Sequence, residues 1–247
     1  MSRRLDAYRE TLRSLDDWIP FLLAESGLPG RRGNLTLAAA VAEEGSPPLF
    51  DMLLAYTPER APTDTPEEFL AFCGTLGQGR LVAEGDPLRF AVLRVLAADP
   101  RWRTREAVAM ALQRVGDHDF DLLLAELERW LDDGDYQRRA IAAGLAEPRL
   151  LTPERTQRVL RMLDRITTRL AAARDRRSPA FLALRKGLGY CWSVVVAADP
   201  ERGEPMLEKW AARDDRDVRW VVRQNLNKKR LQRMDPEWVE ECRKRMT

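Results

Sequence analysis

A tryptophan and a glutamate stand one helical turn apart in the stretch RWRTREAVAMAL, residues 101–112. Side chains four residues apart lie on the same face of a helix, so Trp102 and Glu106 would present an aromatic ring next to a carboxylate. A ring face and a negative charge each attract a cation. The pair, with three arginines around it, indicates either a site for a positively charged group or the solvated face of an ordinary helix.

The sequence holds few of the residues on which other catalytic sites depend. His118 is the only histidine and lies in GDHDFD, which is typical of a turn, so Ser-His-Asp and Cys-His sites are not expected. Cys73, Cys191 and Cys242 lie far apart without a CxxC spacing, which argues against a disulfide framework and a zinc site. No phosphate-binding glycine motif follows a strand-like run. We therefore expect no metal and no cofactor.

Charge is distributed unevenly along the chain, although the formal net charge is only +2. Residues 1–100 carry 10 Lys and Arg against 15 Asp and Glu, whereas residues 101–247 carry 31 against 24. The segment 152–188 holds much of the excess, with 10 basic and 3 acidic residues. Such a surplus favours a polyanionic partner, but arginine-rich helices that are simply well solvated would show it as well.

Apolar residues recur with the period of an α-helix along nearly the whole chain, and no stretch alternates as a strand would. Helices are predicted at 3–26, 34–44, 47–56, 66–80, 86–98, 101–115, 119–132, 136–146, 153–174, 179–198, 203–213, 216–231 and 235–245. Thr65-Pro66 and Thr152-Pro153, each followed by glutamate, are typical helix starts. The fold class is therefore expected to be all-α.

The length of 247 residues is enough for one large domain or two small ones. The sequence has no apolar run of about 18 residues and no N-terminal signal pattern. We therefore expect a cytoplasmic protein without a membrane partner.

Four helical segments resemble one another: TREAVAMAL, RRAIAAGL, LRKGLGYC and VRWVVRQNL. Aligning their basic residues Arg105, Arg139, Lys186 and Arg219 gives separations of 34, 47 and 33 residues, which bracket the helix-pair repeat of HEAT and armadillo proteins. Stacked pairs would bury their apolar faces against each other and form a curved α-solenoid with a concave groove. We expect a single domain over residues 1–247.

Three short motifs occur in order between residue 101 and about residue 210: WRTRE at 102–106, YQRRAI at 136–141 and KGLGY at 186–190. They resemble the Trp-Asp-x-x-Asp run, the Gln-Arg-x-Ala-Ile helix and the Lys-x-x-Gly-Trp segment of the AlkD-type DNA glycosylases in the HEAT-like repeat superfamily. These enzymes remove cationic alkylated purines from DNA. Residues 1–100 match only as generic helices, so the resemblance locates the site in the basic half, residues 101–247.

The resemblance implies a role for each matching residue. Trp102 and Tyr190 would be aromatic surfaces beside the lesion, Glu106 the catalytic carboxylate, and Arg138 a phosphate clamp. An alkylated purine already carries positive charge and leaves readily, so the enzyme needs mainly to stabilise the oxocarbenium-like sugar, which a carboxylate can do without a metal.

The chain departs from the family pattern at three positions. Arg103 replaces the acid that follows the first tryptophan, Glu106 replaces the second aspartate, and Tyr190 replaces the second tryptophan. Glutamate is longer than aspartate by one methylene, and a misplacement of about 1 Å can cost on the order of a hundredfold in rate. The resemblance therefore leaves the competence of Glu106 open.

Basic residues near these motifs are expected to contact DNA phosphates. They are Arg103, Arg105, Arg138, Arg139, Lys186 and Arg219. The basic segments 227–230 and 243–245 would extend this surface, or would serve only to complement the dipole at helix ends.

These observations predict a monomeric enzyme that binds double-stranded DNA and excises N3- or N7-alkylated purines. One alternative is a non-enzymatic HEAT-repeat scaffold that binds a protein partner. The other is a relative that binds DNA without excising a base.

Overall fold

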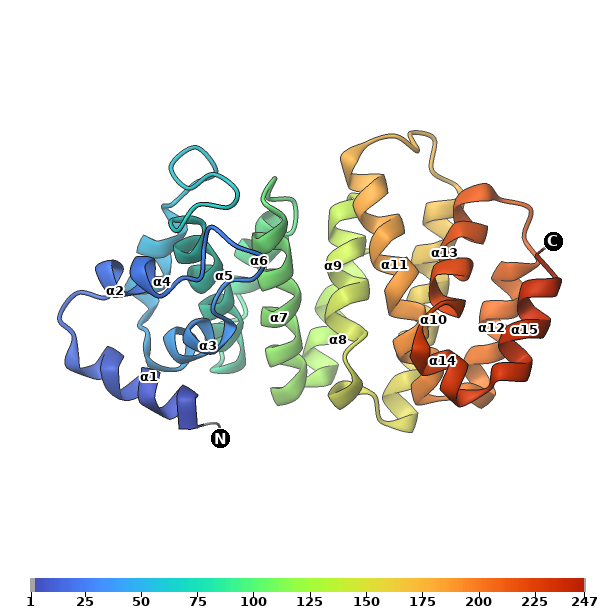
Figure 1. Ribbon diagram of the computed structural model, residues 1–247, viewed down its shortest axis with the longest axis horizontal. Helices are drawn as coiled ribbons and strands as arrows, with labels where there is room; N and C mark the ends of the chain where they lie inside the picture. Colours follow the sequence, from blue (N-terminus) through green and yellow to red (C-terminus); the bar gives the residue numbers. More distant parts are fainter. Residues whose placement is uncertain (1–2, 247) are drawn as a thin grey trace. The chain divides into compact units, whose positions relative to one another are not determined.

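The computed structural model describes residues 3–246, and the chain is helical throughout, with no strand among these residues (Figure 1). The all-α prediction is confirmed. The ends of the expected domain, residues 1–2 and 247, lie outside the described residues.

The chain divides into two compact units, one ending at Leu123 and the other beginning at Leu124, where the sequence predicts a single domain. Unit 1 contains α1 (Arg3–Ser14), α2 (Ile19–Ala24), α3 (Leu35–Glu44), α4 (Pro47–Leu54), α5 (Glu68–Ala83), α6 (Arg89–Leu96) and α7 (Trp102–His118). The division falls within α8 (Phe120–Trp130). Unit 2 contains α9 (Asp135–Leu145), the 3-10 helix η1 (Pro148–Leu150), α10 (Pro153–Ala171), α11 (Pro179–Ala198), α12 (Pro200–Ala211), α13 (Arg216–Leu226), α14 (Lys229–Met234) and α15 (Pro236–Lys244).

Unit 1 is built around α5, which contacts α2, α3, α4, α6 and α7. Fourteen of the sixteen residues of α5 are buried, as expected for a helix that is apolar all round. A Cβ atom on Gly77 would lie 2.4 Å from the Phe50 ring, and one on Gly79 would lie 2.6 Å from the backbone of Ala111. These glycines let α4 and α7 pack directly against α5, and so they fix the helix that carries Trp102 and Glu106.

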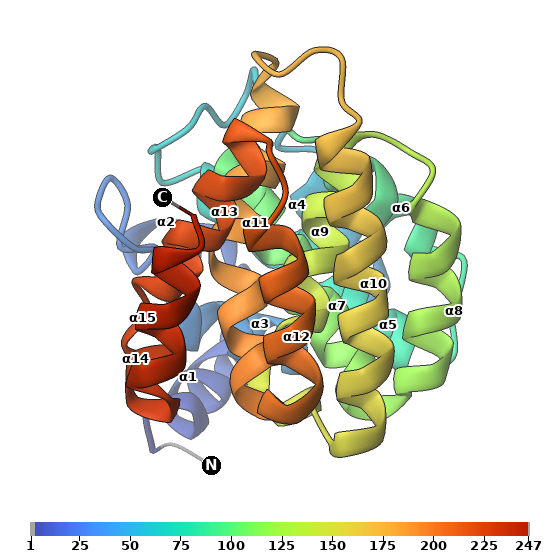
Figure 2. The same cartoon turned by 90° about the vertical axis from the view of Figure 1, so that its right-hand side faces the viewer.

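Unit 2 is built around α11, which contacts α9, α10, α12, α13 and α14 (Figure 2). The fully buried Asn225 joins α13 to α11, because its side chain donates to the carbonyl of Leu188 at 2.9 Å and accepts from the backbone N–H of Ser193 at 2.8 Å. Among the described helices, α11 alone is long and apolar enough to cross a membrane, yet 56% of its apolar window is buried in this core. Its central place in unit 2 accounts for that composition.

Several predicted helix boundaries differ from the structure, among them the start of α5, which begins at Glu68 and not at Pro66. The segment 3–26 forms two helices, α1 and α2, and the side chain of Asp17, in the turn between them, accepts from the backbone N–H of Ile19 at 2.9 Å. The helix predicted at 203–213 begins earlier, because Asp199 caps α12 by accepting from a backbone N–H at 3.2 Å. The segment 216–231 also forms two helices, α13 and α14.

Candidate functional site

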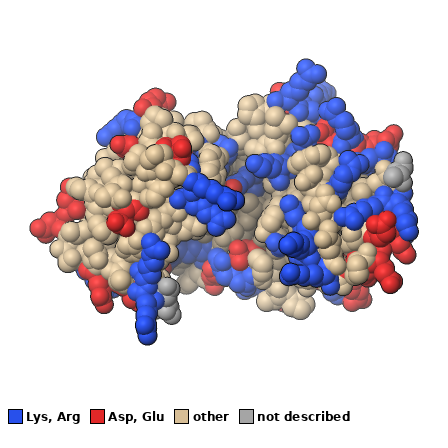
Figure 3. All heavy atoms as spheres, viewed as in Figure 1, with Lys and Arg blue, Asp and Glu red and all other residues tan. Residues whose placement is uncertain are grey.

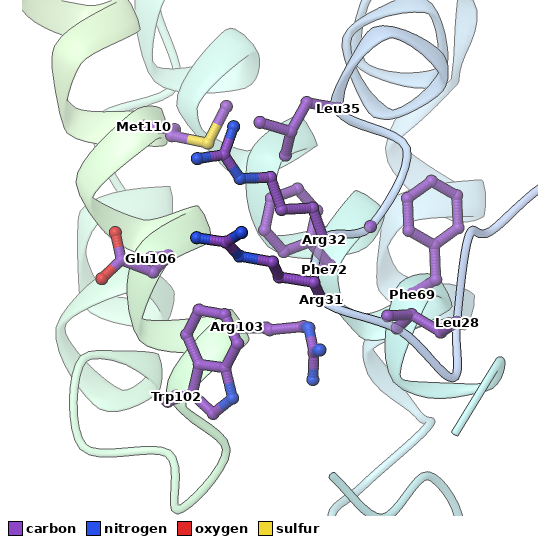
Figure 4. Close-up of a pocket in the computed structure, with 11 residues that line it drawn as sticks. Leu28, Arg31, Arg32, Leu35, Phe69, Phe72, Trp102, Arg103, Glu106 and Met110 are labelled. Carbon is purple, nitrogen blue, oxygen red and sulfur yellow. The ribbon is translucent and has the colours of Figure 1, made fainter. Parts of the chain in front are cut away.

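Trp102 and Glu106 line one pocket of unit 1, with a volume of about 280 Å³ (Figure 4). Its walls come from α7, from α5 and from the segment between α2 and α3. The lining residues are Leu28, Arg31, Arg32, Gly33, Leu35, Phe69, Phe72, Trp102, Arg103, Glu106 and Met110. The spacing of Trp102 and Glu106 along α7 therefore places both side chains at the same concavity, which we name the Trp102 pocket.

The Trp102 pocket has an apolar interior and an exposed aromatic wall. Leu28, Phe69 and Phe72 are buried, whereas Trp102 is 44% exposed and Leu35 is 46% exposed. Large apolar side chains usually lose such exposure when they serve only to pack a core. The pocket is therefore suited to a flat, weakly polar group that can lie against the indole.

Acidic and basic residues of this pocket belong to different walls. Glu106 on α7 is exposed and is the only acid that lines the pocket. In Figure 4 the side chains of Arg31 and Arg32 extend from the α2–α3 segment toward the α7 wall that carries Glu106. Both arginines are exposed, and neither forms an ion pair with a described residue. The pocket thus offers two cations that remain available to an anion, while the carboxylate of Glu106 points away from them in Figure 4.

Arg31 and Arg32 were missed by sequence reasoning. They lie in the segment GLPGRRGN, which has no helical period and no matching motif. The only available signal was an Arg-Arg pair between glycines, which is too common to indicate a site by itself.

Arg103, expected as a DNA contact, has a different part in the structure. Its side chain is 8% exposed, and its guanidinium lies 2.9 Å from the carboxylate of Glu68 and 3.0 Å from that of Asp64. It also donates to the carbonyl of Gly30 at 2.6 Å, and its Cζ atom lies 4.5 Å from the centre of the Trp102 ring. Arg103 therefore joins the α2–α3 segment, α5 and α7, and backs the tryptophan, instead of meeting a phosphate in solvent.

Two further arginines expected at DNA are engaged with carbonyl groups of the backbone. Arg105 donates to the carbonyls of Asp99, at 2.5 Å, and Pro100, at 2.9 Å, just before α7. Arg138 is 15% exposed; it pairs with Asp135 at 2.7 Å and donates to the carbonyl of Leu131 at 2.9 Å. Both side chains brace turns, and their expected contacts with phosphate stay a prediction.

The other basic residues of the prediction lie in unit 2. Arg139 is half-buried, with its Cγ atom 3.3 Å from the position that a Cβ on Gly187 would occupy. Arg219 is 35% exposed and lies 3.5 Å from the carboxylate of Asp214. Lys186 is exposed and forms no ion pair with a described residue. Lys186 is therefore the most accessible cation of the expected set.

A second concavity, of about 540 Å³, lies in unit 2. Its lining residues are Leu182, Arg185, Lys186, Gly189, Tyr190, Trp220, Gln224 and Lys228, from α11, α13 and the start of α14. Tyr190 is 47% exposed, and no acid lines the concavity. We name it the Tyr190 groove; Lys and Arg side chains spread over the visible face of this unit in Figure 3.

An ion-pair cluster beneath the groove holds Arg185 in place. Arg185 and Arg176 both bind the buried carboxylate of Asp217, and Arg176 also lies 2.7 Å from Asp215. Burial alone would raise the pKa of Asp215, but hydrogen bonds from Arg176 and from the backbone N–H of Val218 outweigh it and hold the pKa below its ordinary value. Asp215 therefore stays charged and keeps the cluster assembled.

The structure brings together two pairs of the predicted site residues. Trp102 and Glu106 share the pocket of unit 1, and Lys186 and Tyr190 share the groove of unit 2. The expected convergence of all these residues with Arg138 stays a prediction.

No protein-family model, curated protein or solved structure matches this chain. No group of three or more His, Cys, Asp or Glu side chains that could hold a metal ion occurs within residues 3–246.

Proposed function

We propose that this protein is an alkylpurine-DNA glycosylase and that the Trp102 pocket carries its chemistry. The observation that carries the proposal is that Trp102 and Glu106 line the same pocket and that the Trp102 ring is exposed. A ring and a carboxylate side by side suit a cationic base attached to a sugar, which becomes positively charged as the base leaves.

The reaction would break the bond between C1′ of deoxyribose and the purine nitrogen. The bonding electrons move into the alkylated purine, which leaves as a neutral base. Glu106 would stabilise the positive charge that develops on the sugar and would accept the proton of the water that attacks C1′. Trp102 would hold the cationic base by stacking, an interaction worth about 0.5–2 kcal/mol.

Arg31 and Arg32 would bind the DNA phosphates on either side of the cationic nucleotide. A cationic base alone would be repelled by two exposed guanidinium groups, whereas a nucleotide in DNA brings a negatively charged phosphate on each side. The two arginines on the wall opposite Glu106 would bind those phosphates. The charges of the pocket therefore fit a cationic nucleotide within a strand better than they fit a free base.

The finer fold we propose is a HEAT-like solenoid. The four similar segments of the sequence fall on α7, α9, α11 and α13, which are alternate helices of the chain. Within unit 2, α11 contacts both α9 and α13, as the corresponding helices of successive repeats would. This regular contact supports a stack of helix pairs.

A protein that binds DNA without excision is the second candidate. It is favoured by the replacement of aspartate by the longer Glu106 and by the cationic side chains across the pocket. A protein-binding scaffold is less well supported, because it predicts a buried Trp102, and this residue is 44% exposed.

The test is release of free base from methylated duplex DNA by the purified full-length protein. Release of 3-methyladenine or 7-methylguanine is expected, and Glu106→Gln should abolish release while duplex binding remains. Glu10→Gln, an exposed carboxylate on α1 outside the pocket, is the matched control and should release base like the wild type.

Three results bear against the proposal in different ways. Full release by Glu106→Gln would refute the role of that carboxylate. Binding of duplex DNA without any release by the wild type would favour the second candidate. If methylated duplex is neither bound nor cleaved, the glycosylase proposal fails altogether.

A further inference from the structure

The Tyr190 groove combines an exposed ring with cations that have no acidic partner. Lys228 Nζ lies 5.6 Å from the centre of the Tyr190 ring, and Arg230 Cζ lies 4.8 Å from it. Arg230 also donates to the Tyr190 hydroxyl at 2.6 Å. Lys186, Lys228 and Arg230 form no ion pair with a carboxylate in the described part of the chain. These groups would attract an anion to the side of a flat ring.

The opposite wall of the groove repeats the arrangement. Trp220 on α13 has the guanidinium of Arg185 at 4.6 Å from its ring centre. Gly189 lets the Trp220 ring lie close to the backbone of α11, since a Cβ at residue 189 would lie 3.1 Å from that ring. Gln224 lies one turn further along α13 and adds an amide that can donate to and accept from a ligand. Rings, cations and one amide therefore line a single groove of about 540 Å³.

This chemistry fits a strand whose bases are unpaired. In a duplex each base is stacked on its neighbours, so an aromatic side chain of the protein cannot stack on it, and only phosphates, sugars and base edges are available. Single strands expose base faces, and proteins bind them with a basic groove that follows the backbone and with aromatic side chains on which the bases stack. The volume of the groove is also in the range of sites that enclose a ligand.

We propose that the Tyr190 groove binds unpaired nucleotides of a single-stranded nucleic acid. Tyr190 stacks on a base, Gln224 contacts a base edge, and Lys186 and Lys228 bind the phosphates. This inference goes beyond the glycosylase function, and all the residues of the groove belong to unit 2.

The experiment measures binding of the full-length protein to a fluorescein-labelled oligothymidine of about 12 nucleotides, by fluorescence anisotropy at several salt concentrations. The affinity is expected to fall steeply as salt rises. Tyr190→Ala should weaken binding about 5- to 100-fold, whereas Tyr190→Phe, which keeps the ring, should bind within about 3-fold of the wild type. Tyr190 is half exposed, so Tyr190→Ala should still fold, which a cooperative thermal unfolding transition checks.

Matched charge variants distinguish binding in the groove from nonspecific electrostatic attraction to the protein surface. Lys186→Glu should weaken binding strongly. Arg161→Glu makes the same charge change at an exposed position of α10 outside the groove and should have little effect. An oligouridine of equal length tests whether the groove prefers RNA or DNA. Tighter binding of either oligomer supports the proposal.

Two outcomes would overturn it: unchanged oligothymidine binding by Tyr190→Ala, or a duplex of equal length that binds as tightly and with the same dependence on Tyr190. Glu106→Gln should bind oligothymidine like the wild type. If base release occurs without oligothymidine binding, only this inference fails. If oligothymidine binding depends on Tyr190 but no base is released, only the glycosylase proposal fails.

Discussion

Replacing Arg103 by methionine tests whether this arginine stabilises unit 1 or binds nucleic acid. Methionine keeps much of the apolar volume of the side chain but removes the guanidinium. The change would leave the carboxylate of Glu68, which is fully buried, without its cation. It would also free the carbonyl of Gly30 and one contact of Asp64, a residue whose backbone has a φ of 69°.

The expected loss follows from the burial of this ion pair. Removing one partner of a buried pair usually costs about 3–5 kcal/mol, because the other charge remains in a medium that solvates it poorly. For a cooperative unit of roughly this size, such a loss lowers the melting temperature on the order of 10–20 °C. Arg103→Met combined with Glu68→Gln should be less destabilised than Arg103→Met alone, because the second change removes the stranded charge.

Thermal unfolding followed by circular dichroism measures the effect on the full-length protein. Arg32→Met, which removes the same group from an exposed position, is the control and should melt close to the wild type. A melting temperature of Arg103→Met within about 2 °C of the wild type would refute the reasoning. If that variant also bound duplex DNA more weakly and with a smaller salt dependence, Arg103 would be a phosphate contact, as the sequence first indicated.

Three other predictions follow from the packing and the charges. Gly77→Ala should destabilise unit 1 by about 1–3 kcal/mol in urea unfolding, because its Cβ would lie 2.4 Å from the Phe50 ring; a neutral result would show that α4 moves freely. Burial raises the pKa of Cys242 to about 11, so Ellman's reagent at pH 8 should label this thiol only after unfolding, and rapid labelling of the folded protein would contradict its burial. The hydrogen bond from Arg13 lowers the pKa of Glu44, so this pair stabilises the fold above the ordinary carboxyl pKa of about 4.3 and loses its effect as pH falls through the lower folded value. Glu44→Gln should therefore flatten the acid limb of the stability profile, and an unchanged limb would count against the pair.

Much of the fold could be predicted because its signals are local. Helix α10 begins at Pro153 after the cap Thr152, and α11 begins at Pro179 after the cap Ser178, as the sequence predicts. The break between α1 and α2 was missed, because the apolar period continues through it and the marks of the new start are only Pro20 in the first turn and the Asp17 side chain before it. The expectation of a single domain stays a prediction, because periodicity shows which face of a helix is buried, not which helix covers it.

The candidate site shows the same limit. Four-residue spacing along α7 was enough to place Trp102 and Glu106 on one face. The role of Arg103 could not be read from its neighbours, because Glu68 and Asp64 lie 35 and 39 residues away in the sequence. An exposed arginine and a buried, paired one look alike in a sequence, since the difference is made by partners that only the fold brings near.

The Arg103 anchor has a consequence for ligand recognition. Because it fastens the α2–α3 segment at Gly30, the backbone that carries the neighbouring Arg31 is in position before any ligand arrives. Less backbone freedom is then lost on association, so more of the contact energy is retained as affinity. A redesign of this pocket for a different ligand should vary Arg31, Arg32 and Leu35 and retain Arg103.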